Sequence, residues 1–164
     1  MVQTQDGAIH PPGINKIKEL IAKRVEQVVS NLSLETQLYD SPETLEALCR
    51  MSGSHLGNLL LLIQSAIDET DKLPISRRAV QIAITDARDA DRRTVTNDQW
   101  SILTAVSHSK QILNDEQHRN LLFSRCILEY TDFDGETGRK PWYDVHPLIV
   151  GIAQFQDALA KFQP

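Results

Sequence analysis

The sequence predicts a mainly α-helical fold with one small two-stranded antiparallel hairpin. Apolar residues recur at three- and four-residue steps over most of the chain, and capping residues stand before several of these stretches. The period changes to a strand-like pattern near residue 126, where strand formers are followed by loop residues and a second strand candidate. The 164 residues, 41% of them hydrophobic, can supply a core for one generous domain or two small ones.

The front half is expected to form four helices. Residues 1–13 end in a Pro-Pro-Gly stretch and are expected to be a flexible tail or the remnant of a preceding core. Helices are then predicted over residues 14–30, 42–51 and 55–70, and a fourth begins after Ser76. The helix over 55–70 carries too many apolar residues for a single stripe, so we expect it to be covered on more than one side.

The back half is expected to hold two helices, a hairpin and a closing helix. Capping clusters at 96–98 and 114–117 start the two helices, and residues 126–131 and 142–145 are the strand candidates. Pro147 opens a last helix whose apolar residues repeat down one side as far as Phe162. The charged stretch from Asp89 to Thr96 is the expected boundary, which gives domains at residues 14–94 and 95–164.

Charge and composition narrow the function. The formal net charge of -5 repels phosphate backbones from the molecule as a whole, so contact with nucleic acid requires a local basic patch. Cys49 and Cys126 each stand in an apolar stretch, where a thiol behaves as a small buried hydrophobe. The longest apolar run, residues 59–63, is far shorter than the roughly 20 residues that cross a bilayer. We therefore expect no membrane partner and a cytoplasmic location.

Motifs for catalysis and metal binding are missing from the sequence. There is no His-Glu-x-x-His pair, no cysteine pair at ligand spacing and no Gly-x-Ser-x-Gly elbow. There is also no Gly-x-x-x-x-Gly-Lys-Ser/Thr loop to bind phosphates. The sequence thus predicts a non-catalytic chain without a catalytic residue, metal or cofactor of its own. The histidines are scattered: His10, His55, His108, His118 and His146.

Two segments resemble parts of a known family. Residues 48–60, Leu-Cys-Arg-Met-Ser-Gly-Ser-His-Leu-Gly-Asn-Leu-Leu, resemble the second-sensor helix of AAA+-like ATPases. Residues 122–130, followed by Trp-Tyr-Asp-Val-His-Pro-Leu at 142–148, are similar to the winged-helix tail that follows such lids in bacterial P-loop proteins. The resemblance covers most of the chain from about Gly13 onward. It implies a helical lid-like domain and a winged-helix domain of a AAA+ or STAND-type ATPase, with ATP and Mg²⁺ held by a parent core.

The resemblance also assigns candidate nucleotide-sensing residues. Ser52, Gly53, His55 and Gly57 fall in the second-sensor segment. The family's usual arginine falls on Gly57, and that arginine normally reaches the nucleotide phosphates as a fixed positive charge. A glycine at this position has no side chain that could make this contact.

The winged-helix resemblance leaves two functions open. One is a regulatory module that couples the nucleotide state of a core to partner binding, in contact with that core, with neighbouring subunits or with further copies of the chain. Trp142 and Tyr143 are its candidate anchors, with a core role as the alternative for Trp142. The other function is a DNA-binding domain of transcription or replication. Its candidate cations are Lys110, Arg119, Arg125, Arg139 and Lys140, and the acids Asp115, Glu116, Asp132, Asp134 and Glu136 bring the local charge close to neutral.

Overall fold

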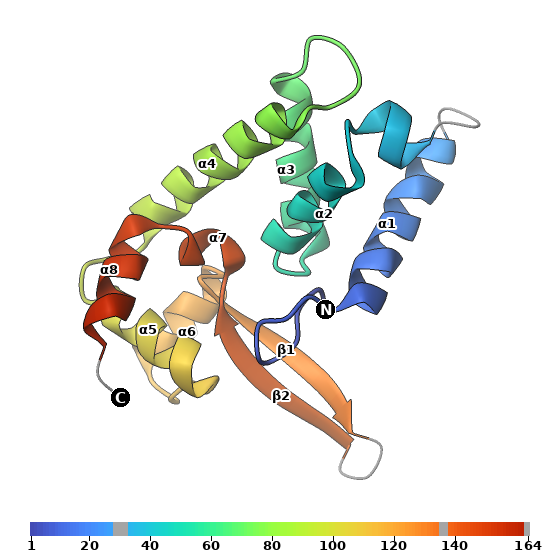
Figure 1. Cartoon of the computed structure of the whole chain (residues 1–164). Coiled ribbons are helices and arrows are strands. Elements are labelled where there is room, and N and C mark those ends of the chain that lie inside the picture. The colour runs from blue at the N-terminus through green and yellow to red at the C-terminus, as the bar shows by residue number, and fades with distance from the viewer. Residues whose placement is uncertain (28–32, 135–137, 163–164) are drawn as a thin grey trace. The chain divides into compact units, whose positions relative to one another are not determined.

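The chain is mainly helical and carries one small two-stranded antiparallel hairpin, as the sequence predicts (Figure 1). The computed structural model describes residues 1–27, 33–134 and 138–162. These residues form two compact units, Met1–Ala87 and Arg88–Pro164. No helix in the described ranges has the length and apolar character needed to span a bilayer.

The first unit packs its helices around α2. Its elements are α1 (Pro11–Glu26), a π-helical turn η1 (Leu34–Leu38), α2 (Pro42–Met51), α3 (Leu56–Asp68) and the start of α4 (Arg77–Thr94). Helix α2 contacts α1, α3 and η1, and its Leu45, Leu48 and Cys49 are fully buried. Ser76 caps α4, as expected, by accepting a hydrogen bond from the N–H of Ala79 at 3.2 Å.

Asp40 ties the segment before α2 to the start of α4. One carboxylate oxygen accepts from the Thr44 hydroxyl at 2.5 Å, and the other accepts from the N–H of Arg77 at 2.7 Å. The Thr44 bond, followed by the weaker effect of Arg77, lowers the pKa of Asp40. Alongside, Tyr39 and Ile75 form a parallel bridge, so two segments remote in sequence are joined by both backbone and side chain.

The structure places residues 1–13 against the first unit. Pro11 and Pro12 lie in the first turn of α1, where a missing N–H costs no hydrogen bond, and the His10 ring accepts from the N–H of Gly13 at 3.1 Å. Upstream, Val2 is buried and its N–H donates to Ser54 Oγ at 2.8 Å. The helix therefore begins before the predicted start at residue 14, because proline is compatible with the first turn of a helix.

The second unit surrounds an apolar core with short elements. They are α5 (Gln99–Ser109), α6 (Glu116–Phe123), β1 (Ile127–Asp134), β2 (Gly138–Val145), α7 (Pro147–Val150) and α8 (Ala153–Lys161), after the end of α4. Helix α5 contacts α8 and β2, and α6 contacts β1. The buried core comprises Val95, Trp100, Leu103, Val106, Leu121, Cys126, Ile127, Val145, Ile149, Ile152 and Phe155.

The predicted single closing helix is wrong. The chain leaves helical geometry at Gly151 and Ile152, where Ile152 has an extended backbone with φ -84° and ψ 135°. A Cβ on Gly151 would lie 2.3 Å from Cζ of Arg88, so only glycine lets this guanidinium pack against the end of α7. Arg88 and Gly151 both belong to the second unit, which starts at Arg88. The second unit therefore begins inside α4, whereas the sequence places the domain boundary after that helix.

Candidate interaction surfaces

Residues 52–55, within the segment that resembles a second-sensor helix, form the turn between α2 and α3. Ser52 is fully buried and its hydroxyl donates to the carbonyl of Cys49 at 2.7 Å, while Gly53 has a φ of 62° that favours glycine. The N–H groups of Ser52, Gly53 and His55 donate to the carbonyls of Leu48, Arg50 and Ser52 respectively. Since these amides already have partners within the chain, the turn is not arranged as a cradle for a phosphate.

His55 and Gly57 complete this turn. The His55 ring accepts from the N–H of Asn58 at 3.2 Å and so caps α3. A Cβ on Gly57 would lie 2.9 Å from the His55 ring, so the ring folds over the position where the family carries arginine. The structure thus places no side chain at residue 57 that could reach a nucleotide.

Helix α3 is covered on one side only. Leu59, Leu62 and Ala66 are buried, and the predicted cover on a second side is absent among the described residues. Leu56, Leu60, Ile63 and Ile67 recur at steps of four, three and four residues, so they share one face, which we call the α3 ridge. Leu56, Leu60 and Ile67 are 44%, 54% and 45% exposed. Leu61, on a different face of the helix, is 71% exposed.

The five candidate DNA-contacting cations do not form one group. Lys110 is partly buried and its ammonium binds Asp144 Oδ2 at 2.6 Å, so it belongs to the interior of the second unit. Arg119 is exposed on α6 and donates to Asn114 Oδ1 at 2.9 Å. Arg125 follows α6 in a left-handed conformation, with a φ of 60°. Arg139 and Lys140 are exposed on β2, away from the α6 pair in sequence.

Acidic residues accompany these cations. Glu116 is exposed on α6, and Asp115 caps that helix by accepting from the N–H of His118 at 2.9 Å. That bond is the largest cause that holds the pKa of Asp115 below its usual range. On β1, the backbones of Asp132 and Asp134 lie opposite Lys140 and Gly138. Glu136 lies outside the described residues.

The two candidate aromatic anchors differ in exposure. Trp142 is 3% exposed and stacks on Tyr130, with ring centroids 4.4 Å apart and planes 22° from parallel. It is a packing residue of the hairpin rather than a surface anchor. Tyr143 is half-buried and its hydroxyl donates to Glu129 Oε2 at 2.9 Å, so its polar tip reaches the surface.

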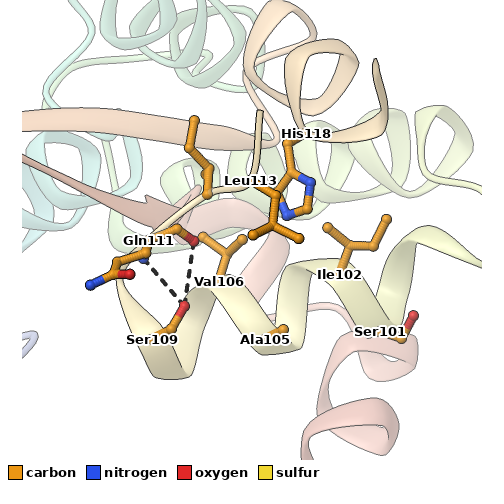
Figure 2. A pocket seen from close by; sticks show the side chains of 9 residues that line it. Ser101, Ile102, Ala105, Val106, Ser109, Gln111, Leu113 and His118 are labelled. Carbon is orange, nitrogen blue, oxygen red and sulfur yellow. Dashed lines mark hydrogen bonds between the residues drawn. The ribbon is translucent and has the colours of Figure 1, made fainter. Parts of the chain in front are cut away.

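Sequence reasoning missed an apolar groove in the second unit (Figure 2). Its volume is about 480 Å³, and α5 forms one wall with Ile102, Ala105 and Val106. The segment after α5 closes the other side, where Leu113 is 66% exposed. The ring of His118 also lines it, and its Nδ1 lies 2.8 Å from Asp115 Oδ2. The groove is mostly apolar, a surface suited to an apolar side chain rather than to a charged ligand.

The thiols and histidines do not assemble a reactive site. Burial raises the pKa of both thiols, that of Cys49 to about 11, which keeps them protonated near neutral pH. His146 is buried and its ring accepts from the N–H of Leu148 at 3.2 Å, so it caps α7 at the corner that follows β2. Within the described part of the chain, no three histidine, cysteine or acidic residues come close enough to hold a metal ion.

Comparison with known proteins assigns no relative. No protein-family model, no curated protein and no solved structure matches the chain.

Proposed function

We propose that this chain is a non-catalytic interaction module, the lid and winged-helix portion of a AAA+ or STAND-type P-loop ATPase. The observation that carries the proposal is the α3 ridge, since a helix with this many leucines is covered on one face alone. Exposed apolar patches of this kind mark protein contacts. The first two ridge residues, Leu56 and Leu60, belong to the segment 48–60 that resembles a second-sensor helix.

The energetics favour a docking role for the ridge. Full burial of a leucine or isoleucine side chain contributes about 1.5–3 kcal/mol, so covering the half-exposed Leu56, Leu60 and Ile67 contributes roughly 1 kcal/mol each. These contributions favour association with a complementary apolar surface on a core or a neighbouring subunit. The ridge carries no charged side chain that such burial would desolvate.

The proposed mechanism is mechanical. Nucleotide state in the parent core would change the angle at which the lid docks, and the second unit would then present or withdraw a binding surface. Gly57 offers no phosphate contact, and the turn amides already have partners. The nucleotide state of the core would therefore be coupled to this chain through the apolar contact of the α3 ridge, and not through a direct bond to the nucleotide.

Photo-crosslinking tests the docking partner. A photoreactive phenylalanine at Leu60, in cells that encode the chain, is expected to crosslink to a protein that carries a Gly-x-x-x-x-Gly-Lys-Ser/Thr loop. The matched control places the same group at Gln81, which is exposed on α4. Crosslinks from Leu60 only to proteins without such a loop, or equal yields from both positions, would refute the proposal.

DNA binding is the alternative, and the exposed cations Arg119, Arg125, Arg139 and Lys140 favour it. Fluorescence anisotropy with duplex DNA at two salt concentrations separates the two functions. Binding that weakens with salt and is lost in Arg119→Ala with Arg125→Ala would support the DNA reading. No binding at low salt would exclude it.

A further inference from the structure

The outer edge of β1 is open. The N–H of Tyr143 donates to the carbonyl of Lys110 at 3.0 Å, on the side of β2 that faces away from β1. Tyr143 lies opposite Glu129, and because its N–H is directed away from β1, these two residues form a pair without ladder hydrogen bonds. The N–H and C=O of Glu129 therefore point away from β2. Thr131, opposite Pro141, has the same orientation two residues on. In the described ranges, no backbone hydrogen bond from another segment reaches Glu129 or Thr131.

The outer edge of β2, by contrast, is closed to further pairing. Lys110 occupies it at Tyr143, and Pro141 has no N–H to offer. Proline is accommodated here because residue 141 belongs to a pair without ladder hydrogen bonds. Strand β1 therefore offers an added strand a longer uninterrupted edge than β2 does.

Charge decides what kind of strand fits. Strand β1 contains the acids Glu129, Asp132 and Asp134 and no lysine or arginine, whereas the start of β2 contains Arg139 and Lys140. Antiparallel pairing of two copies along their β1 edges would bring acidic strand against acidic strand, which is unfavourable. A basic strand is complementary to this edge.

We propose that the β1 edge binds an extended basic segment of a partner protein as an added strand. The N–H and C=O groups of Glu129 and Thr131 would form its ladder, as main-chain hydrogen bonds do in other cases of strand addition. Basic side chains beside Glu129 would give the charge preference. The site lies in the second unit and does not depend on the α3 ridge, so either proposal can fail without the other.

A designed peptide tests the site, because main-chain bonds carry strand addition in any strand-forming sequence. The probe is a capped peptide of alternating lysine and valine. One control replaces lysine by glutamate, and another carries N-methyl groups at alternate residues on the bonding edge. We expect the lysine peptide to bind and to slow amide exchange at Glu129 and Thr131, measured by NMR. Both controls are expected to bind about tenfold more weakly or not at all.

Substitutions in the chain sharpen the test. Thr131→Pro removes an edge N–H but no bond to β2, so the hairpin is expected to persist while peptide affinity falls about tenfold. Thr131→Val, the matched control, keeps the N–H and should retain affinity. Glu129→Lys should weaken the lysine peptide and strengthen the glutamate peptide.

Three results would overturn the proposal. The first is the absence of amide protection at Glu129 and Thr131 with the lysine peptide, which would mean that the acids on β1 serve only to keep the edge unpaired. The second is equal binding of the N-methylated peptide. The third is unchanged affinity in Thr131→Pro while the amide shifts of Tyr130 and Trp142 show an intact hairpin.

Discussion

The ion pair between Lys110 and Asp144 should be a main stabilising contact of the second unit. Lys110 Nζ lies 2.6 Å from Asp144 Oδ2, and the side chains are 20% and 9% exposed. The pair joins the end of α5 to β2, in parallel with the backbone bond from Tyr143 to Lys110. We predict that Lys110→Met, which keeps the apolar stem, leaves a poorly solvated carboxylate without its counter-charge.

The expected cost follows from the burial of the pair. Exposed pairs contribute about 0–1 kcal/mol, and removing one partner of a buried pair costs about 3–5 kcal/mol. The side chain of Lys110 is partly exposed to solvent and that of Asp144 is almost fully buried, so the cost should lie between these two limits. Lys110→Met should therefore lower the free energy of unfolding by about 2–3 kcal/mol. Lys110→Gly should be roughly 1 kcal/mol less destabilised than Lys110→Met, because residue 110 has a φ of 58°.

Urea unfolding followed by tryptophan fluorescence measures this cost. Both tryptophans, Trp100 and Trp142, lie in the second unit, so the signal reports on that unit alone. A double-mutant cycle with Asp144→Asn should give a coupling of about 1–2 kcal/mol. A cost below about 0.5 kcal/mol for Lys110→Met, or no coupling in the cycle, would refute the reasoning.

Three further predictions concern the first unit and the thiols. Gly13→Ala should displace the N-terminal segment, because a Cβ at residue 13 would lie 1.6 Å from the carbonyl oxygen of Met1. Faster proteolysis at residues 1–10, with α1 intact, would confirm this prediction. In the native protein, Cys49 should react with a disulfide reagent at pH 8 roughly 100-fold more slowly than in denaturant, because burial raises the pKa of its thiol. Cys126 should also react more slowly for the same reason. Rapid labelling of the native protein would contradict this prediction. Asp40 has a lowered pKa in the folded state, so it stabilises the fold above its unfolded pKa of about 3.9 and this stabilisation is lost as the pH falls through the folded pKa. Asp40→Asn should therefore be less stable than the parent at pH 7, and the difference should shrink as the pH falls below the unfolded pKa, as measured by urea unfolding with circular dichroism. A pH-independent difference would oppose the assignment.

Local patterns were sufficient to predict most elements of the fold. Helical spacing and the Ser76 cap place α3 and the start of α4 close to their observed bounds, since these signals act within one turn. The prediction of one closing helix is wrong because the chain breaks at Gly151 and Ile152, and the packing of Arg88 against Gly151, which keeps a larger residue out of this position, joins residues far apart in sequence. The first strand was found but continues to Asp134, and the loop predicted after it lies partly outside the described residues. Strand β2 is also longer than predicted, because Pro141 occupies a position that needs no ladder bond.

The candidate surfaces were predicted less completely, for a similar reason. The sequence offers Lys110 as a free cation, and only the fold brings it to Asp144, 34 residues away. The groove beside α5 arises from how the segment after that helix returns, which no periodicity records. The α3 ridge could have been found, since the apolar residues over 55–70 exceed what one covered face needs.

Helix α4 passes through the division between the two units, and this has a practical outcome for anyone who separates them. A protein cut at Arg88 would retain only residues 88–94 of that helix, too short a piece to hold helical form by itself. A self-standing version of the second unit should therefore begin ahead of Arg77, with the Ser76 cap included.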